Sequence, residues 1–149
     1  MRREYPEAPV VAVAAVVLDG DRILLVRRAG EPGRGKWSIP GGVVKLGERL
    51  REAVVREVEE ECGILIEVID LLDVVETIIR DEEGRVRFHY VIVDFLARPL
   101  SGQLRASDDA LEAAWVRLDD VPKMDITRTL GKLLEKHGDK LRALAELAG

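Results

Sequence analysis

The chain has 149 residues, of which 47% are apolar and 34% are charged, and its formal net charge at pH 7 is -5. This length fits one domain over residues 1–149, and the apolar fraction excludes a disordered chain, a collagen-like repeat and a disulfide scaffold. The acidic balance excludes the broad cationic surface that a large nucleic-acid interface needs.

The low content of cysteine and of side-chain amides indicates the cellular compartment and the source of the protein. Cys62 is the one cysteine, so an internal disulfide is impossible and a reducing compartment is indicated. No apolar stretch reaches the roughly 18 residues of a spanning helix, and Pro6, Glu7 and Pro9 interrupt any signal-peptide core. We therefore expect a cytoplasmic protein without a membrane partner. The absence of asparagine, beside a single glutamine, indicates a thermophilic source.

The first third of the chain predicts strands. Residues 10–18 are almost wholly Val, Ala and Leu, and residues 22–28 contain a second apolar run. Asp19-Gly20 lies between them and is typical of a two-residue hairpin turn, so two antiparallel strands are expected, the first buried on both faces. Residues 29–36 hold three glycines and a proline and predict a loop, followed by a short extended piece at residues 37–40.

The rest of the chain predicts a mixture of helix and strand. Apolar residues at helical spacing predict a helix over residues 48–61, and Gly63 follows in the position of a left-handed cap. A strand, a bend and a second strand are expected over residues 64–79, a turn at 81–84, an alternating strand after it, and another strand near 113–117. Two helices are expected near 126–137 and 139–147. The predicted fold class is therefore a single mixed α/β (α+β) domain.

A cluster of carboxylates in residues 41–64 is the most informative feature. Glu57, Glu60 and Glu61 stand at positions i, i+3 and i+4, so their side chains emerge on one face of the helix. Like charges this close repel by about 1 kcal/mol per pair even in water, and the helix C-terminus favours cations instead. A solvated helix end is the alternative, but a hard divalent cation such as Mg²⁺ or Mn²⁺ would turn the repulsion into attraction. Arg56 supplies an internal counter-charge.

The same segment resembles the Nudix box at every defined position. Gly42, Glu48, Arg56-Glu57-Val58, Glu60-Glu61 and Gly63-Ile64 have the spacing of that motif, and residues 37–42 (WSIPGG) resemble the usual approach to it. The resemblance implies a mixed β-sheet sandwiched between the box helix and C-terminal helices. It also implies a Mg²⁺-dependent pyrophosphohydrolase, with Mn²⁺ as a substitute, that cleaves a nucleoside diphosphate linked to another moiety.

The roles of the box residues carry over by position. The resemblance implies that a metal is bound by the carboxylates of Glu57, Glu60 and Glu61 and by the backbone carbonyl of Gly41. Glu48 is expected to support the metal cluster or its water. Arg56 is expected to orient the glutamates rather than to touch the substrate.

Residues outside the box complete the expected site. The family often uses a further glutamate as a metal ligand or general base, and Glu112 is our candidate because residues 108–116 resemble the segment that carries it. Asp108 and Asp109 are alternatives for this role. The non-functional alternative is that Glu112 is only a surface charge before a strand. His137 is assigned no role. The candidates for contact with phosphate or a terminal ribose are Arg27, Arg28, Arg34 and Lys36.

The substrate is less constrained than the reaction. ADP-ribose, cleaved to AMP and ribose 5-phosphate, is the first expectation, although Arg80 stands where the ADP-ribose group often carries proline. A nucleoside triphosphate that releases pyrophosphate is the alternative, and a non-catalytic nucleotide-binding module is a more remote one. Related ADP-ribose hydrolases are commonly homodimers, so a homodimer is also expected from the resemblance.

Overall fold

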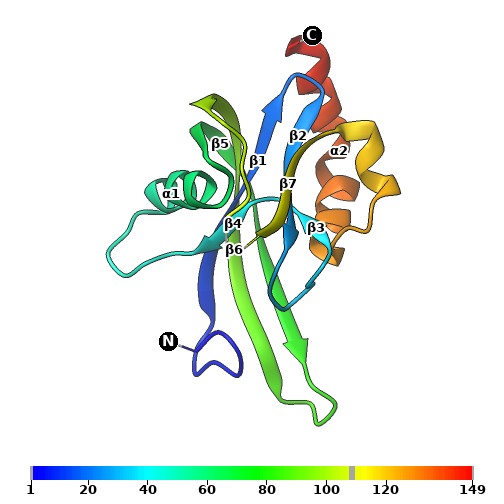
Figure 1. The fold of residues 1–149 in the computed structure, drawn as a ribbon. Coiled ribbons are helices and arrows are strands. Elements are labelled where there is room, and N and C mark those ends of the chain that lie inside the picture. Colours follow the sequence, from blue (N-terminus) through cyan, green and yellow to red (C-terminus); the bar gives the residue numbers. More distant parts are fainter. Residues whose placement is uncertain (1, 108–109, 149) are drawn as a thin grey trace.

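The computed structural model describes residues 2–107 and 110–148. A mixed sheet lies between two helices, with α1 over one face and α2 over the other (Figure 1). The fold class expected from the sequence is confirmed. In chain order, the elements are β1 (Val10–Asp19), β2 (Arg22–Arg28), β3 (Trp37–Ser38), β4 (Gly41–Val43), α1 (Leu50–Cys62), β5 (Ile64–Arg80), β6 (Val86–Gly102), β7 (Ala110–Arg117), the short 3-10 helix η1 (Leu118–Lys123) and α2 (Arg128–Ala148).

β1 is the central strand and joins two groups of neighbours. It pairs in parallel with β6 along one edge, and along the other edge it pairs antiparallel with β4 and, near its end, antiparallel with β2. β2 in turn carries β3 and β7, whereas β6 carries the long strand β5 at the sheet edge. The predicted hairpin is confirmed at the Leu18–Ile23 register.

Alternation along β1 sends its side chains into two separate cores. Val13, Ala15 and Val17 pack with Val54 and Val58 of α1. Residues of the opposite parity face α2, and the core on that side contains Val16, Ile23, Leu25, Leu96, Leu130, Leu133, Leu141 and Ala145. Both faces of β1 are therefore buried, as its composition predicts.

Two predicted elements differ from the structure. Residues 64–80 form one strand rather than two, and the expected bend is present only as register irregularities opposite β6. The C-terminal residues form one helix, α2, through Gly138. A glycine within a helix costs about 1 kcal/mol relative to alanine. Burial of Leu130, Leu133, Leu141 and Ala145, on both sides of that glycine, offsets this cost.

No described helix combines the length and the apolar character that crossing a bilayer requires.

Candidate functional site

A large cleft with a volume of about 1270 Å³ lies between the box segment and α2. One wall is formed by Gly41 and Gly42 of β4 with the last turns of α1, and the other by residues 127–136 around the start of α2. Its floor is the sheet, where β1, β6 and β5 contribute Ala12, Ala14, Asp73, Val75, Ile92 and Asp94.

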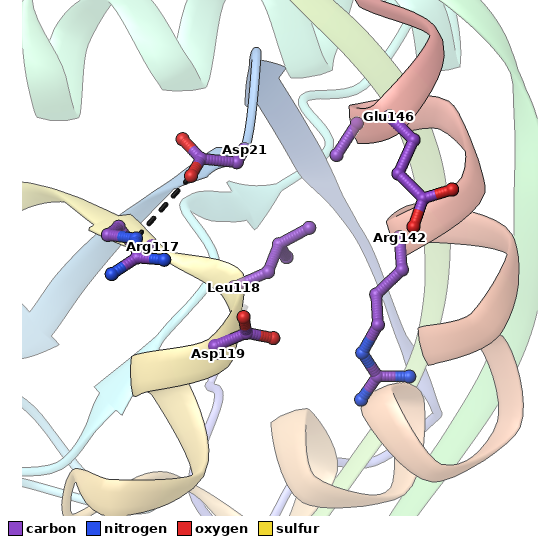
Figure 2. Close-up of a pocket in the computed structure, with 7 residues that line it drawn as sticks. Asp21, Arg117, Leu118, Asp119, Arg142 and Glu146 are labelled. Carbon is purple, nitrogen blue, oxygen red and sulfur yellow. Dashed lines mark hydrogen bonds and ion pairs between the residues drawn. The ribbon is translucent and has the colours of Figure 1, made fainter. Parts of the chain in front are cut away.

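A second hollow, of about 180 Å³, lies between the β1–β2 turn, the end of β7 and α2 (Figure 2). Asp21 and Arg117 form an ion pair at its rim, with 3.4 Å between Arg117 Nε and Asp21 Oδ2. This volume is below that of ordinary ligand pockets, so the larger cleft is the candidate active site.

Arg56 lies at the centre of the box carboxylates. It donates hydrogen bonds to both oxygens of Glu48, from Nε to Oε2 at 2.6 Å and from Nη2 to Oε1 at 2.9 Å. Nη1 donates to Glu57 Oε1 at 2.8 Å and to Glu60 Oε2 at 3.1 Å. The fork–fork contact, together with the Lys45 backbone N–H, lowers the pKa of Glu48 to about 2, and the same pairing raises the pKa of Arg56.

Gly41 and Gly42 bring the backbone of β4 close to these carboxylates. A Cβ atom built on Gly42 would overlap the carboxylate of Glu57, and one built on Gly41 would overlap the carbonyl oxygen of Val13 in β1. The Gly41 N–H donates to Glu61 Oε1 at 3.2 Å. Glycine is therefore required at both positions by close approach rather than by backbone dihedral.

The structure brings most of the predicted site residues to one cleft. Gly41, Arg56, Glu57, Glu60, Glu61, Arg28 and Lys36 all line it. Glu48 is not among the lining residues, because it lies behind the guanidinium of Arg56. Arg28 donates from Nε to the Pro32 carbonyl at 2.7 Å, so this arginine also holds the loop at residues 29–36.

Glu112, the expected general base, is not brought to the cleft. It lies opposite Arg27 in the β2–β7 ladder, and its carboxylate pairs with Arg27 Nη2 at 3.0 Å. Side chains alternate across a strand, so Arg27 and Glu112 point away from the cleft that Val26 and Arg28 line. Neither Arg27 nor Arg34 lines the cleft, and Asp108 and Asp109 lie outside the described residues.

The carboxylates suit a metal in their chemistry, although they are not gathered around one point. Glutamate carboxylates and the Gly41 carbonyl are hard oxygen donors, which is the set that Mg²⁺ and Mn²⁺ prefer. Within residues 2–107 and 110–148, no three acidic, histidine or cysteine side chains stand close enough together to hold an ion. Arg56 occupies Glu57 and Glu60, so a cation would compete with the guanidinium for these two residues.

Two acidic residues on the cleft floor, Asp73 and Asp94, were not predicted from the sequence. Asp94 is 2% exposed and interrupts the otherwise apolar middle of β6, and Asp73 is its partner on β5. Asp73 Oδ2 receives Lys136 Nζ at 3.0 Å and lies 2.8 Å from Nε2 of His137, both on α2. His137 is therefore part of a tie between helix and sheet rather than an idle surface residue. The one signal in the sequence that could have identified this part of the site is Asp94, a single acid within an otherwise apolar strand.

A NUDIX domain family model matches residues 8–136. The chain belongs to the Nudix family. It is 39% identical over 116 residues to an ADP-ribose pyrophosphatase of Methanocaldococcus jannaschii, which is 78% of this chain and 66% of that protein. It is 36% identical over 129 residues to the 8-oxo-dGDP phosphatase NUDT18 of Homo sapiens, which is 78% of this chain and 37% of that protein. The chain thus spans just under two thirds of the first and about a third of the second.

Solved Nudix structures have the same fold. A MutT NUDIX hydrolase from Burkholderia pseudomallei superposes with a TM-score of 0.76 and 37% identity, covering 87% of this chain and 98% of that one. The NUDIX domain of Shewanella oneidensis NrtR, solved in complex with ADP ribose, superposes with a TM-score of 0.71 and 26% identity, covering 91% and 90%. The chain thus has the fold of known Nudix hydrolases, and members of this family generally use a divalent metal.

Proposed function

We propose that this Nudix hydrolase cleaves the diphosphate of ADP-ribose to give AMP and ribose 5-phosphate, with Mg²⁺ as the metal. The carrying observation is the shape of the cleft: the box lies at one wall, and the floor continues past it to α2. This leaves room for groups on both sides of a diphosphate. The 39% identity to an ADP-ribose pyrophosphatase supports the same substrate.

The box residues divide the work between binding and positioning. Glu57, Glu60 and Glu61 would hold the metal with the Gly41 carbonyl, and Mn²⁺ has the same donor preference. When bound, the metal supplies charge neutralisation of the diphosphate and an acidified water. Glu48 fixes Arg56, and Arg56 in turn orients Glu57 and Glu60, so a paired arginine positions the carboxylates without contacting the substrate.

Cationic side chains on the other walls suit the phosphates of the substrate. Arg28 and Lys36 come from β2 and the loop that follows it, and Arg128, Lys132 and Lys136 come from α2. They face the acidic box across the cleft, so an anion bound between the two walls is attracted by both the metal and these residues.

A triphosphate substrate is the second candidate. The observation in its favour is the 37% identity over almost the whole length of a MutT NUDIX hydrolase. Such a reaction would use the same box residues and release pyrophosphate. The two candidates differ only in what lies beyond the diphosphate.

The test is a substrate panel at millimolar Mg²⁺ that compares ADP-ribose with the eight common nucleoside triphosphates, and products are separated by ion exchange. We expect ADP-ribose to have the highest kcat/KM and to yield AMP and ribose 5-phosphate. A higher kcat/KM for a triphosphate, with pyrophosphate as product, would overturn the substrate assignment. Binding of ADP-ribose without turnover would indicate a sensor module instead.

A further inference from the structure

Asp94 is a buried acid with no protein partner. Asp94 and Thr127 are the only polar side chains buried in the part of the chain that the structure describes, and Asp94 is 2% exposed. No hydrogen bond from any residue in 2–107 or 110–148 reaches its carboxyl group. Burying an unpaired polar group costs free energy, and such groups in folded proteins usually have a ligand, a water or a catalytic role.

The surroundings of Asp94 suit a flat heterocycle. It shares its face of the sheet with Ile92 of β6, Ala12 and Ala14 of β1 and Val75 of β5, all of which line the cleft. Ala14 pairs with Gly41 on one side and with Asp94 on the other. Asp94 therefore lies two strand spacings, about 10 Å, from Gly41. A largely apolar floor that carries a few polar groups is the usual form of a pocket for an aromatic ring.

The acid beside Asp94 in the ladder is itself paired with two basic groups of α2. Asp73 lies directly beside Asp94 in the ladder and is held by His137 and Lys136 of α2. These contacts lower the pKa of Asp73 to about 2, so it is ionised. Burial, together with the charge of Asp73, raises the pKa of Asp94 to about 7, which leaves its carboxyl group able to donate as well as accept a hydrogen bond.

We propose that Asp94 is a specificity-determining residue whose carboxyl group binds the adenine base of the nucleotide, accepting from the 6-amino group and donating to ring nitrogen N1. This rests on the proposed function, which supplies the nucleotide. Adenine offers one donor and one acceptor at that edge, matching a protonated carboxyl group.

The test is binding of AMP and of purine riboside 5′-monophosphate, which lacks only the 6-amino group, measured by calorimetry in EDTA. We expect wild-type protein to bind AMP about tenfold more tightly, the scale of one hydrogen bond to a buried polar group. Asp94→Asn keeps one donor and one acceptor, so it should keep this preference. Asp94→Leu and the smaller Asp94→Ala should bind both ligands equally.

A matched control uses an acid of β5 that lies outside the cleft. Asp70→Leu removes an exposed acid of the neighbouring strand β5, outside the cleft, and should leave the AMP preference unchanged. The proposal fails if wild type binds both monophosphates equally or binds neither, or if Asp94→Leu or Asp94→Ala keeps the preference. It also fails if Asp94→Asn keeps AMP affinity but loses about a hundredfold in kcat, since Asp94 would then carry a proton in the reaction. Because these ligands are not hydrolysed, failure to cleave ADP-ribose overturns the proposed function and leaves this test standing.

Discussion

Among single residues, Glu57 has the most demanding surroundings. Its carboxylate receives a hydrogen bond from Arg56, and the backbone of Gly42 approaches it so closely that no Cβ atom fits between them. Two independent features therefore fix one side chain, and this is the arrangement expected of a group whose position matters to the reaction.

Replacing Glu57 tests that inference. Glu57→Gln removes a charged oxygen donor while preserving the shape, and we expect kcat for the best substrate to fall roughly 10²- to 10⁴-fold. The fold should persist, as judged by circular dichroism. Glu59→Gln is the matched control, because Glu59 is exposed on the same helix and lies outside the cleft. Equal losses in the two variants would mean that helix charge, rather than Glu57, supports turnover.

Glu112 provides the opposite case. Its side chain is 56% exposed and pairs with Arg27 on the far side of β2. We expect Glu112→Gln to change kcat less than threefold and stability by less than about 1 kcal/mol, the usual scale of an exposed ion pair. Steady-state kinetics and urea unfolding measure both quantities. A loss of turnover by orders of magnitude would instead restore the general-base role that the sequence resemblance implies.

At the scale of elements, the β4–α1 junction shows how two adjacent glycines serve different neighbours. Gly41 is limited by β1 and Gly42 by the α1 glutamate. One substitution should therefore damage the sheet, and the other the site.

This difference gives a paired experiment. Gly41→Ala places a methyl group against the backbone of Val13 and Ala14 and should lower the free energy of unfolding by about 1–3 kcal/mol, the range for an overpacked site. Gly42→Ala displaces the Glu57 carboxylate and should lower kcat at least tenfold with a smaller loss of stability. Urea titration and initial rates separate the two effects. Identical profiles for both variants would contradict the assignment.

The elements also show what could be predicted from sequence. The box helix and its Gly63 cap depend on residues within one short segment, and Gly63 has the left-handed dihedrals expected of it. The tie between Asp73 and His137 joins residues 64 apart, and neither residue type indicates such a contact. The position of Glu112 illustrates a related point: the motif gives its neighbourhood in sequence, whereas strand alternation decides the face on which it lies.

For the whole molecule, the buried acid links stability to pH. The unfolded chain releases the proton of Asp94 near pH 4, whereas the folded protein holds it until about pH 7. Between these values the folded state binds more protons, so Asp94 makes the free energy of unfolding fall as pH rises, by at most about 1.4 kcal/mol per pH unit. The lowered pKa values of Glu48 and Asp73 act in the opposite sense below pH 4.

Urea unfolding at pH 5, 6, 7 and 8 measures this dependence in the absence of metal and nucleotide. We expect the free energy of unfolding of the wild type to decline over this range relative to Asp94→Asn, which has no proton to release. The difference between the two proteins should grow up to about pH 7 and then level off. Parallel profiles would show that Asp94 is already ionised in the folded protein.

The position of β5 at the sheet edge has a consequence for how substrate preference can diversify. The proposed metal-binding residues lie on β4 and α1, whereas Asp73 and Val75 come from an outermost strand and Lys132 and Lys136 from the last helix. Changes to Val75, Lys132 and Lys136 leave the central registers untouched, because none of the three belongs to either core. A directed-evolution library confined to Val75, Lys132 and Lys136 should therefore yield altered nucleotide preference at little cost in folding yield, whereas a library of equal size on β1 should mostly lose folded protein.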